Sequence, residues 1–149
     1  MRVRVAHSPD ADDHFLFWAI KTARIPCPDF DFEFVAMDTE DLNLQAQSGE
    51  FDIIAISLAT LPLVTKDYLL LSSGASVGRR YGPKLICKNG EKECLAKAIA
   101  SSSFEGLVGI PGNHTTAARL LRKLIPNVQT LEIPLSPFQG VFRAIQENQ

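Results

Sequence analysis

Residues 107–124 read LVGIPGNHTTAARLLRKL, which divides into a short apolar run, a polar loop and a stretch with helical periodicity. Residues 2–20, RVRVAHSPDADDHFLFWAI, repeat the same order. In both segments the apolar run is typical of a buried strand, and the polar loop stands where helix-capping side chains are favoured. The repeated pattern predicts two segments that each fold as a strand, a loop and a helix.

Further strands and helices are predicted between and after these two segments. Alternating apolar residues predict a strand at 30–35, and the continuous apolar run FDIIAI predicts a strand at 51–56. We expect three more strands at 68–71, 84–87 and 128–133, and helices at 39–48, 58–64, 92–101 and 136–146. Asp38 or Thr39 is placed to cap the first of these helices. Strands that alternate with helices at this spacing predict an α/β fold with a largely parallel sheet.

Composition narrows the class of protein. The chain has 149 residues, of which 46% are hydrophobic and 21% charged, as in ordinary globular proteins. Residues 1–60 hold 11 of the 17 acidic side chains but only 4 of the 15 basic ones, and the basic residues that follow are scattered without interleaved aromatics. This distribution does not indicate a nucleic-acid-binding surface, so we expect no nucleic-acid partner.

The cysteines and the apolar segments indicate a cytoplasmic protein without a membrane span. Cys27, Cys87 and Cys94 form no C-x-x-C pair, which favours reduced thiols. The N-terminus lacks an apolar stretch of signal-peptide length. The most apolar segment, 53–64, is well short of the ~20 residues that cross a bilayer. The histidines have no metal-ligand spacing, so we expect no metal site.

Polar positions follow three of the predicted strands, at the edge where open α/β sheets bind ligands. They are the loop from Ser8 to Asp13, Ser57 at the end of FDIIAI, and the loop from Gly112 to Ala117. The start of a helix favours an anion through its unpaired N–H groups and its dipole. We therefore expect these positions to bind an anionic group of a small molecule.

Some of these polar residues, and the aromatic residues of the first helix, can be explained by purely structural roles. Ser8, Asp10 and Thr115 are equally well placed to do no more than cap the helices that follow them. We expect the aromatic side chains of the first helix to be core residues: Phe15, Phe17 and Trp18.

Four motifs carry a family resemblance. In chain order they are SPDADDHFLFWAI (8–20), FDIIAIS (51–57), SSGASVGRRYGP (72–83) and IPGNHTTAA (110–118). In order and spacing they resemble the menaquinone-biosynthesis family of 1,4-dihydroxy-6-naphthoate synthase, over nearly the whole chain. The SPDADD opening resembles these synthases more than chorismate dehydratase, their relative in the same pathway.

The resemblance implies a fold similar to type II periplasmic binding proteins, which have two α/β lobes, a hinge and a ligand cleft between the lobes. By this comparison residues 1–75 form the first lobe, residues 76–88 the hinge crossover and residues 89–149 an incomplete second lobe. We take these boundaries as the predicted domain organisation.

The resemblance also implies a function. Members of the family are carbon–carbon lyases that cleave cyclic dehypoxanthinyl futalosine, a small anionic aromatic substrate, without a metal or an organic cofactor. By this resemblance, six positions of the chain match the family's substrate contacts: Ala55, Ile56, Ser57, Thr115, Thr116 and Ala117. The residue pattern adds Ser8 as a seventh candidate for substrate binding.

The family's general base is a histidine in an I-H-E type motif, and none of His7, His14 and His114 matches it. We therefore expect the base to lie beyond Gln149 in a longer protein, with no catalytic residue in this chain and little activity in the chain alone.

The interpretations that remain open concern both structure and function. Instead of leading into a further strand of a longer protein, the predicted helix at 136–146 could pack on the edge of a small sheet. Two other functions also remain open: a solute-binding protein of the same fold, and chorismate dehydratase.

Overall fold

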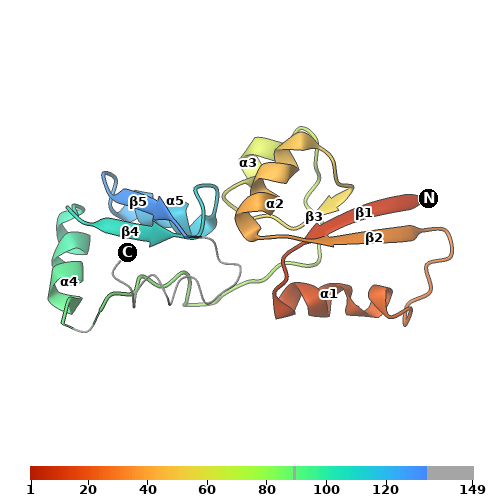
Figure 1. Ribbon diagram of the computed structural model, residues 1–149, viewed down its shortest axis with the longest axis horizontal. Coiled ribbons are helices and arrows are strands. Elements are labelled where there is room, and N and C mark those ends of the chain that lie inside the picture. Colours follow the sequence, from red (N-terminus) through yellow and green to blue (C-terminus); the bar gives the residue numbers. More distant parts are fainter. Residues whose placement is uncertain (89, 134–149) are drawn as a thin grey trace. The chain divides into compact units, whose positions relative to one another are not determined.

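The computed structural model describes residues 1–88 and 90–133 of the chain (Figure 1). The chain divides into two compact units, Met1–Gly78 and Arg79–Gln149, and each is described by itself. Within the described residues, no helix is both long enough and apolar enough to span a membrane.

The first unit is built on a three-stranded parallel sheet. Its strands are β1 (Arg2–His7), β2 (Asp31–Ala36) and β3 (Ile53–Ile54), in the order β2-β1-β3. The register pairs Val5 of β1 with Phe34 on one side and with Ile53 on the other. The first strand of the chain is therefore the central strand of the sheet.

The core of this unit follows from that central position. Val5 and Ala6 are 1% and 0% exposed, because β1 has neighbours along both edges and helices on both faces. Ala6 packs with Leu42 and Phe51 in the core cluster. The core thus combines β1 with Leu42 of α2 and with Phe51, while the strand predicted at 51–56 is shorter than expected and spans only Ile53–Ile54.

Helices cover both faces of this sheet (Figure 1). On one face lies α1 (Ala11–Lys21), and on the other lie α2 (Thr39–Gln45) and α3 (Leu61–Val64). A 3-10 turn, η1 (Ala46–Ser48), continues α2. The side chain of Asp38 accepts from the Glu40 N–H at 3.1 Å, which confirms Asp38 as the cap of α2.

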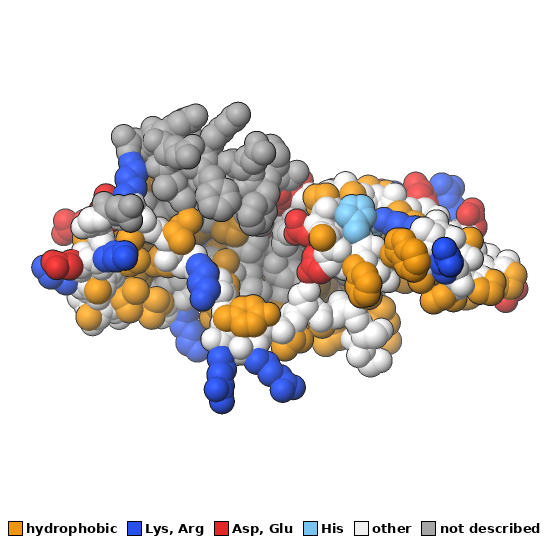
Figure 2. All heavy atoms as spheres, turned by 90° about the horizontal axis from the view of Figure 1, so that it is seen from below, with side chains coloured by type: hydrophobic (Ala, Val, Ile, Leu, Met, Phe, Trp, Pro, Cys, Tyr) orange, Lys and Arg blue, Asp and Glu red, His pale blue; other side chains and the backbone are white. Residues whose placement is uncertain are grey.

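Two predictions for α1 are wrong. Asp10 stands at the N-cap but makes no side-chain capping hydrogen bond. Phe15 and Trp18 are 83% and 51% exposed, whereas Phe17 is half-buried against the His7 and Phe34 rings. The sequence FLFW places apolar side chains all around the helix, and only one side of a helix can face the sheet. Figure 2 shows hydrophobic side chains on the outer surface of this unit.

The described part of the second unit begins with the helix α4 (Lys92–Ser101). A βαβ segment follows, made of β4 (Leu107–Ile110), α5 (Thr116–Leu124) and β5 (Gln129–Glu132). β4 and β5 pair in parallel, with Leu107 opposite Gln129 and Ile110 opposite Glu132. Ala118 of α5 is fully buried, as are Ile110 and Ile125 at 3% and 1% exposure.

The predicted α/β class with parallel sheets is confirmed, but two predicted strands are wrong. Residues 68–71 and 84–87 are described, and neither segment forms a strand. Leu69, Leu70 and Leu71 are 91%, 72% and 61% exposed, so their hydrophobicity does not reflect burial in a sheet. The predicted helix at 136–146 lies outside the described residues.

Candidate functional site

Ser8 and Ser57 lie at the same edge of the three-stranded sheet. They follow β1 and β3, which are parallel neighbours, so their carboxyl ends meet at that edge. The Ala55 N–H donates to the Ala6 carbonyl at 2.9 Å, which holds the segment after β3 against β1. The half-buried Ala55 and Ile56 then lead to Ser57.

Asn43 of α2 holds Ser57 in place. Its Oδ1 accepts from the Ser57 N–H at 2.8 Å, and its Nδ2 donates to Ser57 Oγ at 3.2 Å. Asn43 is fully buried, and a buried amide needs such partners to offset its desolvation. In the described part of the chain we find no hydrogen bond donated by the Ser57 hydroxyl, so its hydrogen remains available to a ligand.

Ser8 is committed to the turn that leads into α1. It is 7% exposed, and its N–H donates to Asp13 Oδ2 at 2.7 Å. Its hydroxyl accepts from the Asp10 N–H at 3.2 Å. Both N–H groups precede α1, so Ser8 and Asp13 hold the turn before the helix and do not cap its first-turn N–H groups.

Both ring nitrogens of the buried His7 are also engaged. Nδ1 lies 2.5 Å from the Ser8 carbonyl oxygen and Nε2 lies 2.6 Å from Lys21 Nζ. A carbonyl oxygen only accepts, so Nδ1 carries the hydrogen and Nε2 accepts from the Lys21 ammonium. His7 therefore supports the end of β1 and presents no unoccupied nitrogen to a substrate.

Thr115 is the N-cap of α5. Its hydroxyl accepts from the Ala118 N–H at 3.3 Å and donates to the Gly112 carbonyl at 2.8 Å, and the residue is 3% exposed. The predicted capping role of Thr115 is confirmed, and its hydroxyl has no further hydrogen to donate. Thr116 and Ala117 form the first turn of α5, at the positive end of the helix dipole.

The loop before Thr115 is fixed by a polar network. Glu132 accepts from the N–H and the side-chain amide of Asn113, the former at 3.2 Å. Arg122 donates to the Asn113 carbonyl at 3.2 Å, to its side-chain oxygen, and to Thr130 Oγ1 at 3.3 Å. Side chains of α5 and β5 thus preset the path of the loop.

The predicted site residues fall into two groups. Ser8, Ala55, Ile56 and Ser57 belong to the first unit, and Thr115–Ala117 belong to the second. Sequence reasoning missed Asn43, because a polar residue in a polar helix gives no sign of burial. Among the described residues no cluster of His, Cys, Asp or Glu side chains could hold a metal ion.

Comparison with known proteins gives a consistent result. The chain is 28% identical over 149 residues to a 1,4-dihydroxy-6-naphthoate synthase of Streptomyces coelicolor, with 97% of this chain and 49% of that protein covered. It is 36% identical over 120 residues to a protein of the same name from Thermus thermophilus, with 80% and 40% covered. The chain thus spans about half the length, or less, of the curated relatives that it matches.

A solved structure is similar to this chain over nearly its whole length. A crystal structure of a protein from Archaeoglobus fulgidus superposes with a TM-score of 0.79 at 31% identity, over 99% of this chain and 50% of that one. The family described as menaquinone biosynthesis matches residues 3–141. This match includes both groups of candidate site residues, and the chain belongs to the menaquinone biosynthesis family.

Proposed function

We propose that this chain takes part in forming 1,4-dihydroxy-6-naphthoate, by binding cyclic dehypoxanthinyl futalosine for carbon–carbon bond cleavage. The two relatives named 1,4-dihydroxy-6-naphthoate synthase support the formation of this product. The observation that carries the proposal is the clamp of Asn43 on Ser57, which directs a serine hydroxyl to the ligand-binding edge of a parallel sheet.

Two sets of donors would bind the substrate. The Ser57 hydroxyl donates one hydrogen bond, and its orientation is preset by Asn43. The Thr116 hydroxyl and the first-turn N–H of Ala117 supply donors at the positive end of the α5 dipole, where a carboxylate is favoured. Preset donors of this kind need little reorganisation when the substrate binds.

Thr115 and Ser8 have supporting roles in this proposal. Thr115 uses both functions of its hydroxyl within the chain, so it shapes the start of α5 and does not contact the substrate through that group. Ser8 likewise holds the turn before α1. Ala55 and Ile56 bring the backbone to Ser57.

The chain's own contribution is binding and orientation. We do not assign the general base to His7, because its ring is buried and both nitrogens have partners. His14 and His114 do not match the family's histidine motif. Proton transfer is therefore left to a histidine of that motif, and the two compact α/β units are proposed to be the lobes of a type II periplasmic-binding-protein-like fold.

Calorimetric titration of the 149-residue chain with 1,4-dihydroxy-6-naphthoate and, separately, with chorismate tests the proposal. We expect the naphthoate to bind about tenfold more tightly or better, a difference of about 1.4 kcal/mol. Tighter binding of chorismate would point to the dehydratase instead. Binding of neither compound would contradict a substrate-binding role.

A further inference from the structure

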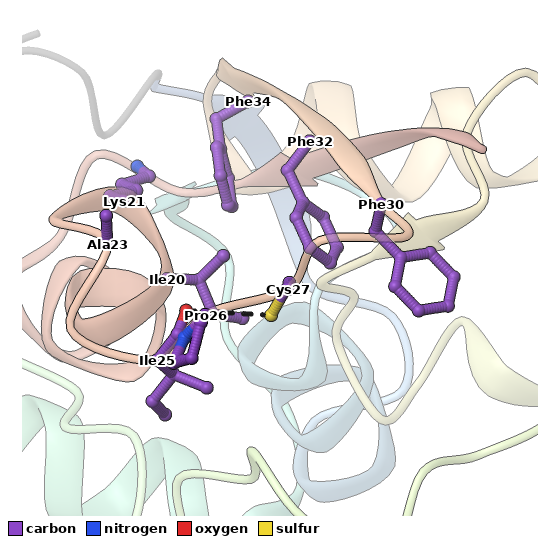
Figure 3. A pocket seen from close by; sticks show the side chains of 9 residues that line it. All are labelled: Ile20, Lys21, Ala23, Ile25, Pro26, Cys27, Phe30, Phe32 and Phe34. Atoms are coloured by element: carbon purple, nitrogen blue, oxygen red, sulfur yellow. Dashed lines mark hydrogen bonds between the residues drawn. The ribbon is translucent and has the colours of Figure 1, made fainter.

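An open groove lies in the first unit, between the end of α1 and the face of β2 (Figure 3). Its volume is about 330 Å³, at the lower end of the range for small-molecule sites. We call it the Lys21 groove, and its principal lining residues are Ile20, Lys21, Ile25, Phe30, Phe32 and Phe34. Neither Ser57 nor the α5 helix contributes to its lining.

One wall of the Lys21 groove is aromatic. Phe30, Phe32 and Phe34 alternate along the chain, so their side chains share one face of the strand. Their ring centroids are 5.9 and 6.0 Å apart in succession, and Figure 3 shows the three rings side by side. Ile20 and Ile25 lie across from them (Figure 3). A flat aromatic ring would fit between these apolar walls.

A single fixed cation stands at one end of the aromatic wall. Lys21 Nζ donates to His7 Nε2 at 2.6 Å and lies 4.7 Å from the centre of the Phe34 ring. In the described ranges, 1–88 and 90–133, no carboxylate forms an ion pair with this ammonium. An ammonium has three hydrogens, and His7 receives one of them.

We propose that the Lys21 groove binds a flat aromatic monocarboxylate, with its ring against Phe32 and Phe34 and its carboxylate on Lys21. One point charge and an apolar wall suit a single carboxylate better than a phosphate, which needs several donors. His7 holds the Lys21 ammonium before the ligand arrives, which lowers the entropy cost of binding. This site is separate from the Ser57 site and does not rest on the proposed function.

The test uses 2-naphthoate and its uncharged analogue, naphthalene-2-carboxamide, in fluorescence titrations of the full 149-residue chain. We expect the carboxylate to bind about tenfold more tightly than the amide, because only the carboxylate carries a charge that the Lys21 ammonium can pair with. Lys21→Met should remove this preference, while Lys66→Met, at another exposed lysine, should keep it. Equal binding of acid and amide, or no effect of Lys21→Met, would overturn the proposal.

A second measurement uses only the unaltered chain, so its result does not depend on whether a variant folds. In the unaltered chain, nuclear Overhauser effects from the naphthoate ring should reach the methyl groups of Ile20 and Ile25. Contacts only to methyl groups near Ser57, such as those of Ile56, would overturn the Lys21 groove as the site.

Discussion

The buried amide of Asn43 holds both the backbone and the side chain of Ser57. The two hydrogen bonds measure 2.8 Å to the Ser57 N–H and 3.2 Å to its Oγ, and they join α2 to the end of the β3 strand. These two bonds fix the position of the Ser57 Oγ, while its hydroxyl hydrogen can still turn toward a ligand. The packing of α2 on the sheet therefore positions the Ser57 hydroxyl, which is the binding group that we propose for the first unit.

Replacing Asn43 tests the structural side of this relationship. Asn43→Ala leaves the Ser57 N–H without its acceptor, and we expect a loss of about 1–3 kcal/mol in the free energy of unfolding. Chemical denaturation measures this loss. Asn127→Ala is the matched control at an exposed asparagine and should stay within about 0.5 kcal/mol of the parent chain. Equal stability of the two variants would mean that the clamp contributes nothing.

Replacement by valine should have different effects at the two neighbouring threonines, Thr115 at the N-cap of α5 and Thr116 in its first turn. Thr115→Val removes the N-cap and should destabilise the chain by about 1 kcal/mol. Thr116→Val should weaken binding of the naphthoate by about 1–3 kcal/mol, because it removes the hydroxyl that we propose to donate to the carboxylate. Calorimetry on these variants, with Thr65→Val as an exposed control, separates the two roles. Unchanged affinity in Thr116→Val would leave that threonine with a structural role only.

Tyr68 ties the segment after α3 to the start of β3. Its hydroxyl donates to the Phe51 carbonyl at 2.7 Å, so Tyr68→Phe should cost about 0.5–1.5 kcal/mol of stability near neutral pH. Tyr81→Phe, at a side chain 67% exposed, is the control and should cost little. A loss of the same size in both variants would contradict the role of the hydrogen bond.

The same residue predicts an alkaline pH dependence. Burial raises the pKa of Tyr68 above its ordinary value of 10.0. The protonated form is favoured in the folded chain, so its stabilisation is fully present below pH 10.0 and is lost as the pH rises through the raised pKa. The stability difference between the parent chain and Tyr68→Phe should therefore shrink in strongly alkaline solution. A difference that grows there would have the wrong sign.

Gly49 ends the turn that follows α2 in a left-handed conformation, with φ of +70°. Nothing lies within 4 Å of the position where a Cβ would stand, so backbone strain alone sets the cost of a side chain. We expect Gly49→Ala to lose about 1 kcal/mol in thermal or chemical unfolding. Gly82→Ala, at a position with equal space and no positive φ, is the control. Equal effects at both glycines would contradict this explanation.

The sequence predicted most of the local structure, because strand and helix periodicities are local signals. The alternation in residues 30–35 and the cap at Asp38 both have a direct physical cause within a few residues. The prediction of a strand at 68–71 was wrong because an apolar run forms a strand only where another segment is available to pair with it. Leu69 and its neighbours are exposed instead.

The candidate site was predicted less completely. Ser57 and Thr115 could be found because each stands at the end of a recognisable strand or the start of a recognisable helix. The contact of Asn43 with Ser57 joins residues 14 positions apart through the packing of α2 on the sheet, and no local pattern marks it. The Lys21 contact with His7 is likewise a product of tertiary structure.

The central claim is that the Ser57 hydroxyl, held by Asn43, donates a hydrogen bond to the substrate. The most direct test is calorimetric titration of Lys21→Met and of the double variant Lys21→Met, Ser57→Ala with 1,4-dihydroxy-6-naphthoate, because the Lys21 groove would otherwise bind the same aromatic carboxylate. Alanine keeps the backbone N–H that Asn43 accepts, so the fold should persist while the hydroxyl is lost. We predict that the dissociation constant rises about tenfold or more. An unchanged dissociation constant in a folded double variant would contradict the account.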